Sequence, residues 1–153
     1  MPKLQLDLQI ETNSDLVPTK KKFKAWAKLA LRVDTEFTIR IVDLEEGRMF
    51  NSTYRGKDYA TNVLTFPLAD EPHLMGDIVI CAPIVEAEAK AQNKTVEAHY
   101  AHLTVHGVLH LHGYDHENEE QEIATIAFES ECKRQAAQEP GRPKRIFERV
   151  RRE

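Results

Sequence analysis

The chain has 153 residues with 41% hydrophobic and 30% charged side chains, which suits one globular domain whose core needs no disulfide bond. Its formal net charge of −4 argues against a protein that binds polyanions over its whole surface. The N-terminal residues contain neither the unbroken apolar run of a signal peptide nor a stretch long enough to span a bilayer, so we expect a soluble, cytoplasmic protein with no membrane partner.

The first half of the chain alternates predicted strands and helices. Period-two alternation of apolar and polar residues indicates strands with one buried face, while apolar residues at helical spacing, opposite lysines, indicate a basic amphipathic helix capped by Thr19. In chain order, these elements are a strand at 4–10, the basic helix at 20–33, a strand at 36–42, a polar turn at 43–47 and a short helix around 48–54.

The second half starts with two short β-branched runs that end at prolines and then turns to residues that favour helices. The predicted elements are strands at 63–66 and 77–82, helices at 83–92, 95–112 and 118–137, and a basic tail from about 139. Strands early in the chain and helices late predict an α+β fold, with a mixed sheet of about four strands packed against helices. We expect residues 1–153 to form a single domain.

Charged residues are segregated along the chain. Residues 20–32 carry six basic residues and no acid, residues 115–131 carry seven acids and no base, and the tail from Gly141 is basic again. A charged segment of this kind is most often a solvated face. The two basic segments on either side of the histidine-rich region nevertheless keep RNA open as a partner.

Five of the seven histidines lie between residues 102 and 116. On a helix, His106 and His110 are one turn apart on the same face, so both imidazoles can reach one cation. Gly113 is placed where a left-handed residue would end the helix and let His116 fold back to supply a third nitrogen. Three imidazoles with a fourth position left to water are typical of a catalytic zinc site, which we expect at the C-terminal end of this helix, with one zinc ion per chain.

The spacing of these histidines is also that of the metzincin metalloproteases, whose signature requires a glutamate directly after the first histidine as general base. Gly107 occupies that position here, which argues against peptidase chemistry. Three other histidines are expected to be ordinary packed or surface residues: His73, His99 and His112. For His102, one turn before His106, two interpretations stay open: a side chain that supports the metal ligands, or a packed residue.

Several sequence blocks carry a resemblance to a known family. Residues 106–116, HGVLHLHGYDH, are similar to the H-G-x-L-H-L-x-G-Y-D-H signature of the YbeY endoribonucleases. Residues 51–55 and 60–67 resemble that family's N-x-x-Y-R and P-T-[DN]-V-L-[ST]-F-P segments, except that Ala60 replaces the usual proline, and residues 76–78 fit a further segment. The blocks and the chain length indicate a resemblance over the entire chain.

The resemblance implies a zincin-like α+β fold and a single-strand-specific, metal-dependent endoribonuclease of the bacterial cytoplasm. Such an enzyme would act in ribosomal RNA maturation, notably at the 3′ end of the small-subunit rRNA, and in ribosome quality control. Its partners would be the rRNA precursor, the small ribosomal subunit and ribosome assembly proteins. The resemblance also implies His106, His110 and His116 as zinc ligands and Arg55 as the catalytic arginine. An arginine suits this role because its fork of N–H donors binds two phosphate oxygens.

Functions from three different classes remain open at this point. The first is an endoribonuclease, the second a metallohydrolase of another substrate such as a peptide, and the third a non-catalytic, metal-stabilised ribosome assembly factor. Gly107 counts against a peptidase, because glycine has no side chain to take a proton from water. The basic segments favour the two RNA-linked functions but do not separate cleavage from binding.

Overall fold

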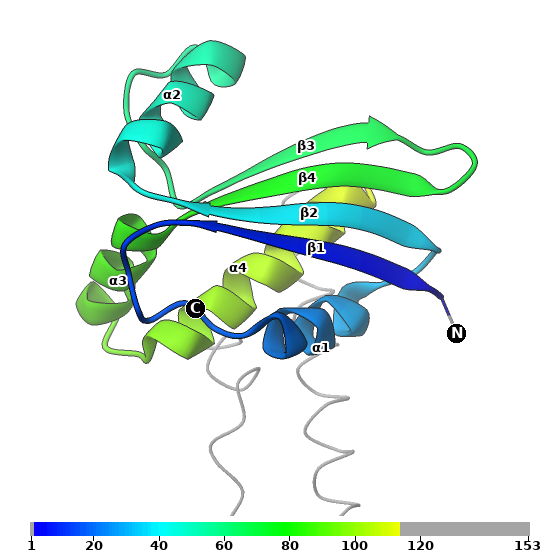
Figure 1. Ribbon diagram of the computed structural model, residues 1–153, viewed down its shortest axis with the longest axis horizontal. Coiled ribbons are helices and arrows are strands. Elements are labelled where there is room, and N and C mark those ends of the chain that lie inside the picture. Colours follow the sequence, from blue (N-terminus) through cyan, green and yellow to red (C-terminus); the bar gives the residue numbers. More distant parts are fainter. Residues whose placement is uncertain (1, 114–153) are drawn as a thin grey trace, which may run out of the picture.

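The computed structural model describes residues 2–113, which form an α+β fold (Figure 1). The predicted helix at 118–137, the basic tail and His116 lie outside the described residues. In chain order, the elements are β1 (Leu4–Glu11), α1 (Lys20–Ala30), β2 (Thr35–Val42), α2 (Leu44–Arg55), β3 (Val63–Ala69), β4 (Leu74–Cys81), α3 (Ala82–Ala91) and α4 (Val96–Leu111).

The strands form one mixed sheet of four strands in the order β1-β2-β4-β3. β1, β2 and β4 run parallel to one another, and β3 pairs with β4 in the antiparallel direction. β3 is therefore an edge strand whose outer edge pairs with no strand in the described range. The predicted α+β class and the mixed sheet of about four strands are confirmed.

Three helices, α1, α3 and α4, cover one face of the sheet (Figure 1). Alternate residues of β2 and β4 point toward these helices and are fully buried, namely Ile39, Ile41, Ile78 and Ile80. From the helical side, the Phe23 ring packs edge-to-face on Trp26 and Tyr100, with ring centroids 5.6 and 5.8 Å apart. Burying each such side chain contributes about 1.5–3 kcal/mol, so the period-two pattern of the strands decides which face the helices cover.

The opposite face of the sheet is more open. Among the described elements, only α2 lies over it, and α2 covers one end (Figure 1). The strand residues that point to this face include polar ones, such as Gln9, Thr38 and Asp77. A second, smaller apolar cluster lies on the same face, with Phe50 of α2 packed against it: Val42, Leu64, Val79 and Cys81. This open face and the exposed edge of β3 are surfaces on which a site can be built.

Two parts of the chain differ from the sequence prediction. The polar stretch 43–47, predicted as a turn, is instead the start of α2. Glu45 and Glu46 occupy its first turn, where negative charge interacts favourably with the helix dipole. β3 continues past Pro67 to Ala69, because proline is tolerated on an edge strand, where its missing N–H can face away from the partner.

Candidate active site

Helix α4 carries the histidine-rich face. Thr95 caps its N-terminus by accepting a hydrogen bond from the Ala98 backbone N–H at 3.1 Å, and Glu97 lies in the first turn, where its charge favours the helix. The helix ends at Leu111, and Gly113 follows with a φ of 87°, a left-handed conformation that favours glycine. The prediction that Gly113 terminates this helix in a left-handed conformation is confirmed.

His106 and His110 lie on the same face of α4. Their ring centroids are 4.6 Å apart with the ring planes inclined by 42°, and both side chains are half-buried. Two imidazoles this close can bind one cation, so the pair fits two of the nitrogen ligands that a zinc site requires. Residues 2–113 contain no cluster of three metal-binding side chains, and the third predicted ligand, His116, lies outside the described residues.

Gly107 lies on the side of α4 that faces the sheet. A Cβ atom built at this position would be 2.9 Å from Cδ1 of Ile78, a fully buried residue of β4. The absence of a side chain therefore lets α4 approach β4 closely. A glutamate here would enter the core instead of facing the histidines, so the packing of α4 on β4 is itself a reason for glycine at this position.

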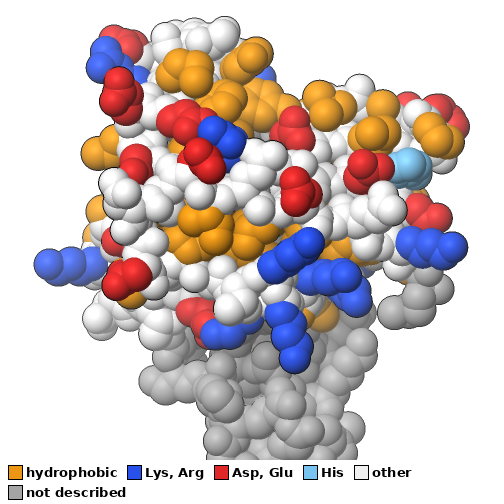
Figure 2. Space-filling view, viewed as in Figure 1, with side chains coloured by type: hydrophobic (Ala, Val, Ile, Leu, Met, Phe, Trp, Pro, Cys, Tyr) orange, Lys and Arg blue, Asp and Glu red, His pale blue; other side chains and the backbone are white. Residues whose placement is uncertain are grey.

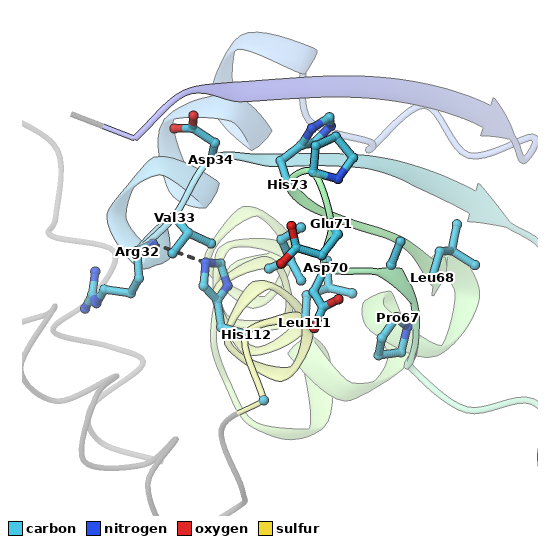
Figure 3. Close-up of a pocket in the computed structure, with 14 residues that line it drawn as sticks. Arg32, Val33, Asp34, Pro67, Leu68, Asp70, Glu71, His73, Leu111 and His112 are labelled. Carbon is cyan, nitrogen blue, oxygen red and sulfur yellow. Dashed lines mark hydrogen bonds between the residues drawn. The ribbon is translucent and has the colours of Figure 1, made fainter.

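His112 points away from the face that carries His106 and His110. Its Nδ1 is 2.7 Å from the carbonyl oxygen of Val108, and its Nε2 accepts a hydrogen bond from the Arg32 backbone N–H at 3.2 Å (Figure 3). Burial lowers the pKa of His112, which keeps the imidazole neutral and able to accept this bond. His112 thus joins the end of α4 to the end of α1, as expected of a packed residue.

Two further histidines on α4 are tightly packed. His99 is buried, and its Nε2 lies 2.8 Å from Oε1 of Glu88 on α3. His102 stacks on His99 with ring centroids 6.0 Å apart and lies 6.1 Å from the His106 ring. Burial lowers the pKa of His102 to about 3, so its ring is neutral. His102 therefore contacts a predicted ligand and is also packed, and both interpretations of this residue stay open.

A pocket of about 950 Å³ lies at the C-terminal end of α4, between the α1–β2 connection and the β3–β4 turn (Figure 3). Three acidic residues line it, namely Asp34, Asp70 and Glu71, whereas Arg32 is basic. His73, which the sequence marks as an ordinary residue, also lines the pocket, and its Nε2 lies 3.0 Å from Glu36. This acidic lining is unsuited to a polyanion.

Arg55 is the last residue of α2, which ends at Gly56 with a φ of 70°. The Arg55 guanidinium donates a hydrogen bond to the carbonyl oxygen of Thr65 on β3 at 2.7 Å, and its central carbon lies 4.9 Å from the centroid of the Phe66 ring. Arg55 is exposed, and in the described part of the chain it has no carboxylate partner. The guanidinium is thus held in place while most of its donors stay free for an anion.

Each of the two predicted parts of the site lies on a helix that contacts β3. Helix α4 packs against β3 on the helical face of the sheet, and Arg55 reaches a carbonyl of the same strand from α2. Because β3 is an edge strand, an extended chain can reach it from the side. Helix α2, through Arg55, and helix α4, which carries His106 and His110, therefore both contact strand β3.

A smaller pocket of about 490 Å³ lies on the open face of the sheet beside α2. We call it the open-face pocket, and its lining includes Tyr54, Arg55, Phe66 and Asp77. No sequence pattern assigned an individual role to Tyr54, Phe66 or Asp77. Their period-two positions within β3 and β4 place Phe66 and Asp77 on the open face of the sheet. They lie next to each other only because these two strands pair.

The predicted basic helix is confirmed in α1. Thr19 accepts a hydrogen bond from the Lys22 backbone N–H at 3.4 Å, and four lysines are exposed on the side away from the core: Lys20, Lys21, Lys24 and Lys28. Figure 2 shows Lys and Arg side chains gathered over this helix. Lys22 is engaged in an ion pair with Glu97 of α4. The remaining lysines form a basic surface, which we call the α1 basic face.

Comparisons with known proteins agree with one another. The family described as endoribonuclease YbeY matches residues 7–136. A Methylobacillus flagellatus protein named endoribonuclease YbeY is 62% identical over 130 residues, which covers 85% of this chain and 87% of that protein. A Delftia acidovorans protein of the same name is 52% identical over 134 residues, with 84% and 88% covered.

A solved structure is also similar. The solution structure of a Thermotoga maritima protein matches with a TM-score of 0.53 and 29% sequence identity, covering 92% of this chain and 99% of that chain. In the part of the chain that the structure describes, no helix is long and apolar enough to cross a membrane.

Proposed function

The chain belongs to the YbeY endoribonuclease family, and from this premise we propose that it cleaves single-stranded segments of the ribosomal RNA precursor. The proposed target is the 3′ end of the small-subunit rRNA, with a further role in ribosome quality control. We place the reaction in the cytoplasm, with the small ribosomal subunit and its assembly proteins as partners. The proposed zinc ligands are His106, His110 and His116, and the proposed catalytic arginine is Arg55.

The observation that carries this proposal is the environment of Arg55. Its guanidinium is fixed by the Thr65 carbonyl and by the Phe66 ring, yet it has no carboxylate partner among residues 2–113. An exposed arginine that is held by neutral groups keeps its full charge for a ligand. Arginine binds phosphate through two parallel N–H donors, so a phosphodiester lying along β3 would be both anchored and oriented by Arg55.

The histidine pair fits the zinc part of the proposal. The half-buried rings of His106 and His110 are spaced for one cation, and imidazole nitrogen is a preferred zinc ligand. When bound, zinc would supply Lewis-acid chemistry that neutralises the negative charge developing on a phosphoryl oxygen. The role of the chain itself is to hold His106 and His110 on a rigid helix and to present the substrate phosphate to Arg55.

RNA affinity has a second source in the α1 basic face. Its exposed lysines carry positive charge that the net charge of −4 conceals. Lysines of this kind bind phosphates without regard to sequence and release counterions on binding. They would therefore strengthen binding of an RNA strand whose scissile phosphate lies at Arg55.

The two alternative functions from the sequence are less well supported. Peptidase chemistry of the metzincin type needs a carboxylate after His106, and Gly107 leaves no room for one because it faces Ile78. The relatives that match this chain are named endoribonucleases, which favours RNA cleavage over a purely structural role in ribosome assembly.

The proposed function is tested by incubating the zinc-loaded protein with a structured RNA that carries a single-stranded end, and with casein in parallel. We expect cleavage in the single-stranded end, no cleavage of casein, and loss of RNA cleavage in the His110→Ala variant. RNA cleavage that persists unchanged in His110→Ala would remove the histidine site from the mechanism. Cleavage of casein in place of RNA would favour the peptidase.

A further inference from the structure

The open-face pocket is separate from the histidine face and has the size of a small-ligand site. Its volume of about 490 Å³ falls within the range of roughly 300–1,000 Å³ that is usual for pockets that bind small molecules. Strands β2, β3 and β4 form its floor and α2 forms one wall. The pocket adjoins the proposed catalytic site because Arg55 lines it.

The floor of the pocket is set by strand register. Asp77 on β4 is paired with Phe66 on β3 and with Thr38 on β2, so these three residues form one row across the open face. An aromatic ring, a carboxylate and a hydroxyl group therefore lie next to one another. Such a row combines a flat apolar surface with hydrogen-bonding groups, which is the combination that a planar heterocycle requires.

Aromatic rings from α2 complete the wall of the pocket. The Tyr54 ring lies 5.4 Å from the Phe66 ring in an edge-to-face arrangement and 6.2 Å from the Phe50 ring, nearly parallel to it. These contacts fix the orientation of Tyr54, but 59% of this residue remains exposed. A fixed, exposed aromatic ring offers a surface on which a nucleobase can stack.

Asp77 supplies the polar group of the pocket. In the described range it takes part in no hydrogen bond or ion pair, although it is half-buried. Burial raises the pKa of the Asp77 carboxyl. A partly desolvated carboxylate without a hydrogen-bond donor is unfavourable, because it has lost water and gained no partner. A ligand that donates N–H groups to this carboxylate offsets the desolvation cost.

Guanine is the base whose donors match a carboxylate best. Its Watson–Crick edge presents two adjacent N–H groups, one on the ring and one on the exocyclic amine, and a carboxylate accepts both through its two oxygens. Uracil offers a single ring N–H at that edge, and inosine lacks the exocyclic amine of guanine. The Asp77 carboxylate in this pocket therefore favours guanine over uracil and over the base of inosine.

We infer that the open-face pocket binds one unpaired guanine of the RNA substrate, stacked against Tyr54 and hydrogen-bonded by Asp77, with the adjoining phosphate at Arg55. This inference rests on the proposed function, since it assumes a single-stranded RNA substrate. Through it, the enzyme gains a base preference near the cleaved bond, which a site made only of phosphate contacts cannot provide.

The test measures the affinity of the zinc-loaded protein for short fluorescent oligouridines with one central guanine, inosine, adenine or uracil. Fluorescence anisotropy, read at low temperature within the first seconds after mixing, gives each Kd before the strands are cleaved, and gels confirm that the RNA is still intact at that time. We expect the guanine strand to bind about tenfold more tightly than the inosine or uracil strands, and Asp77→Asn to remove this difference. Tyr54→Ala should weaken binding of all four strands by roughly 5- to 100-fold, because stacking is insensitive to base identity.

Tyr59→Ala is the matched control, because Tyr59 is 55% exposed and does not line the open-face pocket. It should leave every Kd unchanged, and melting temperatures should show that all variants are folded. Equal affinity for the guanine and inosine strands, or a guanine preference that survives in Asp77→Asn, would overturn the inference. Absence of RNA cleavage by the wild type would reject the proposed function instead, because the binding assay does not depend on turnover.

Discussion

Among single residues, Arg55 differs from Arg40, the other arginine that lines the open-face pocket. Arg40 is engaged by Glu46 at 2.5 Å and by Gln9 at 2.8 Å, whereas Arg55 is held by a carbonyl oxygen and an aromatic ring. A carboxylate partner would compete with phosphate for the guanidinium. The neutral contacts of Arg55 therefore position the charge without neutralising it.

Replacing Arg55 should impair catalysis and leave the fold intact. Arg55→Ala should keep its zinc and melt within about 2 °C of wild type, because an exposed side chain contributes little to stability. Its RNA cleavage rate should fall by about 10²-fold or more, the usual loss on removing one preorganised donor. Arg55→Lys should recover little of this rate because lysine lacks the fork of donors.

The control for this prediction is Arg48→Ala. Arg48 lies on the same helix, is exposed, and forms an ion pair with Asp58 at 2.7 Å. Its loss should not change the cleavage rate. Full activity in Arg55→Ala, with metal content measured in parallel, would exclude this arginine from the mechanism.

His99 gives a prediction on pH dependence. Burial lowers its pKa below the ordinary value of 6.5, and this effect outweighs the hydrogen bond to Glu88, which acts in the opposite direction. The folded protein therefore binds fewer protons at this site than the unfolded chain. The stability that His99 contributes is complete above about pH 6.5 and is lost as the pH falls from there toward the lowered pKa.

His99→Gln should reduce this acid sensitivity. The amide of glutamine can donate to Glu88 but does not titrate, so the free energy of unfolding should fall less between pH 7 and pH 5 than it does in wild type. Urea unfolding at several pH values measures this difference. Parallel pH profiles for the two proteins would show that His99 does not titrate on unfolding.

At the scale of elements, the contact between α4 and β4 depends on small residues. A Cβ at Gly107 would lie 2.9 Å from Ile78, and one at Gly76 would lie 2.4 Å from Cδ2 of Leu111. These glycines bring the histidine helix onto the sheet at two successive points. The position of His106 and His110 relative to β4 is therefore set by the close packing at these glycines, not by the histidines themselves.

Introducing the metzincin glutamate should damage this contact and create no peptidase. Gly107→Glu forces a carboxylate toward buried Ile78 and should cost about 3 kcal/mol, which for a chain of this size lowers Tm by roughly 6–12 °C. Gly107→Ala should cost less, because it adds a single methyl group. Thermal unfolding and a casein assay test this prediction, and a stable Gly107→Glu protein that cleaves casein would contradict it.

The α1 basic face gives a second prediction at this scale. Lys21→Gln and Lys24→Gln should each weaken RNA binding, and each lost phosphate contact should reduce the salt slope of log K by about 0.7 for single strands. Lys22→Gln should have a smaller effect, because Lys22 already pairs with Glu97. If the salt slope does not change in a Lys21→Gln/Lys24→Gln double variant, α1 is only a solvated surface.

At the scale of the whole molecule, local patterns predicted most of the fold. Apolar periodicity in the first half of the chain, and β-branched runs and helix-favouring residues in the second half, located every described strand and helix to within a few residues. Helical spacing placed His106 and His110 on one face. The error at 43–47 arose because Gly47 and nearby polar residues resemble a turn, whereas the helix forms through acidic residues in its first turn.

Features made by strand pairing could not be predicted from the sequence. Asp77 and Phe66 face the same pocket because β3 returns antiparallel to β4, and no local pattern specifies that register. The same holds for the hydrogen bond from Arg55 to Thr65, which joins a helix end to the edge strand. The resemblance indicated Arg55 as functional, but only the fold shows what holds its guanidinium in place.

In the proposed mechanism, His106, His110 and His116 bind one zinc ion on which RNA cleavage depends. The most direct test is a zinc titration of metal-free protein, with the cleavage rate of a single-stranded RNA measured at each step. We expect a rate that rises from near zero and levels off at about one zinc per chain, and no rise for the His106→Ala/His110→Ala variant. Full cleavage without zinc, or an unchanged titration curve in that variant, would contradict it.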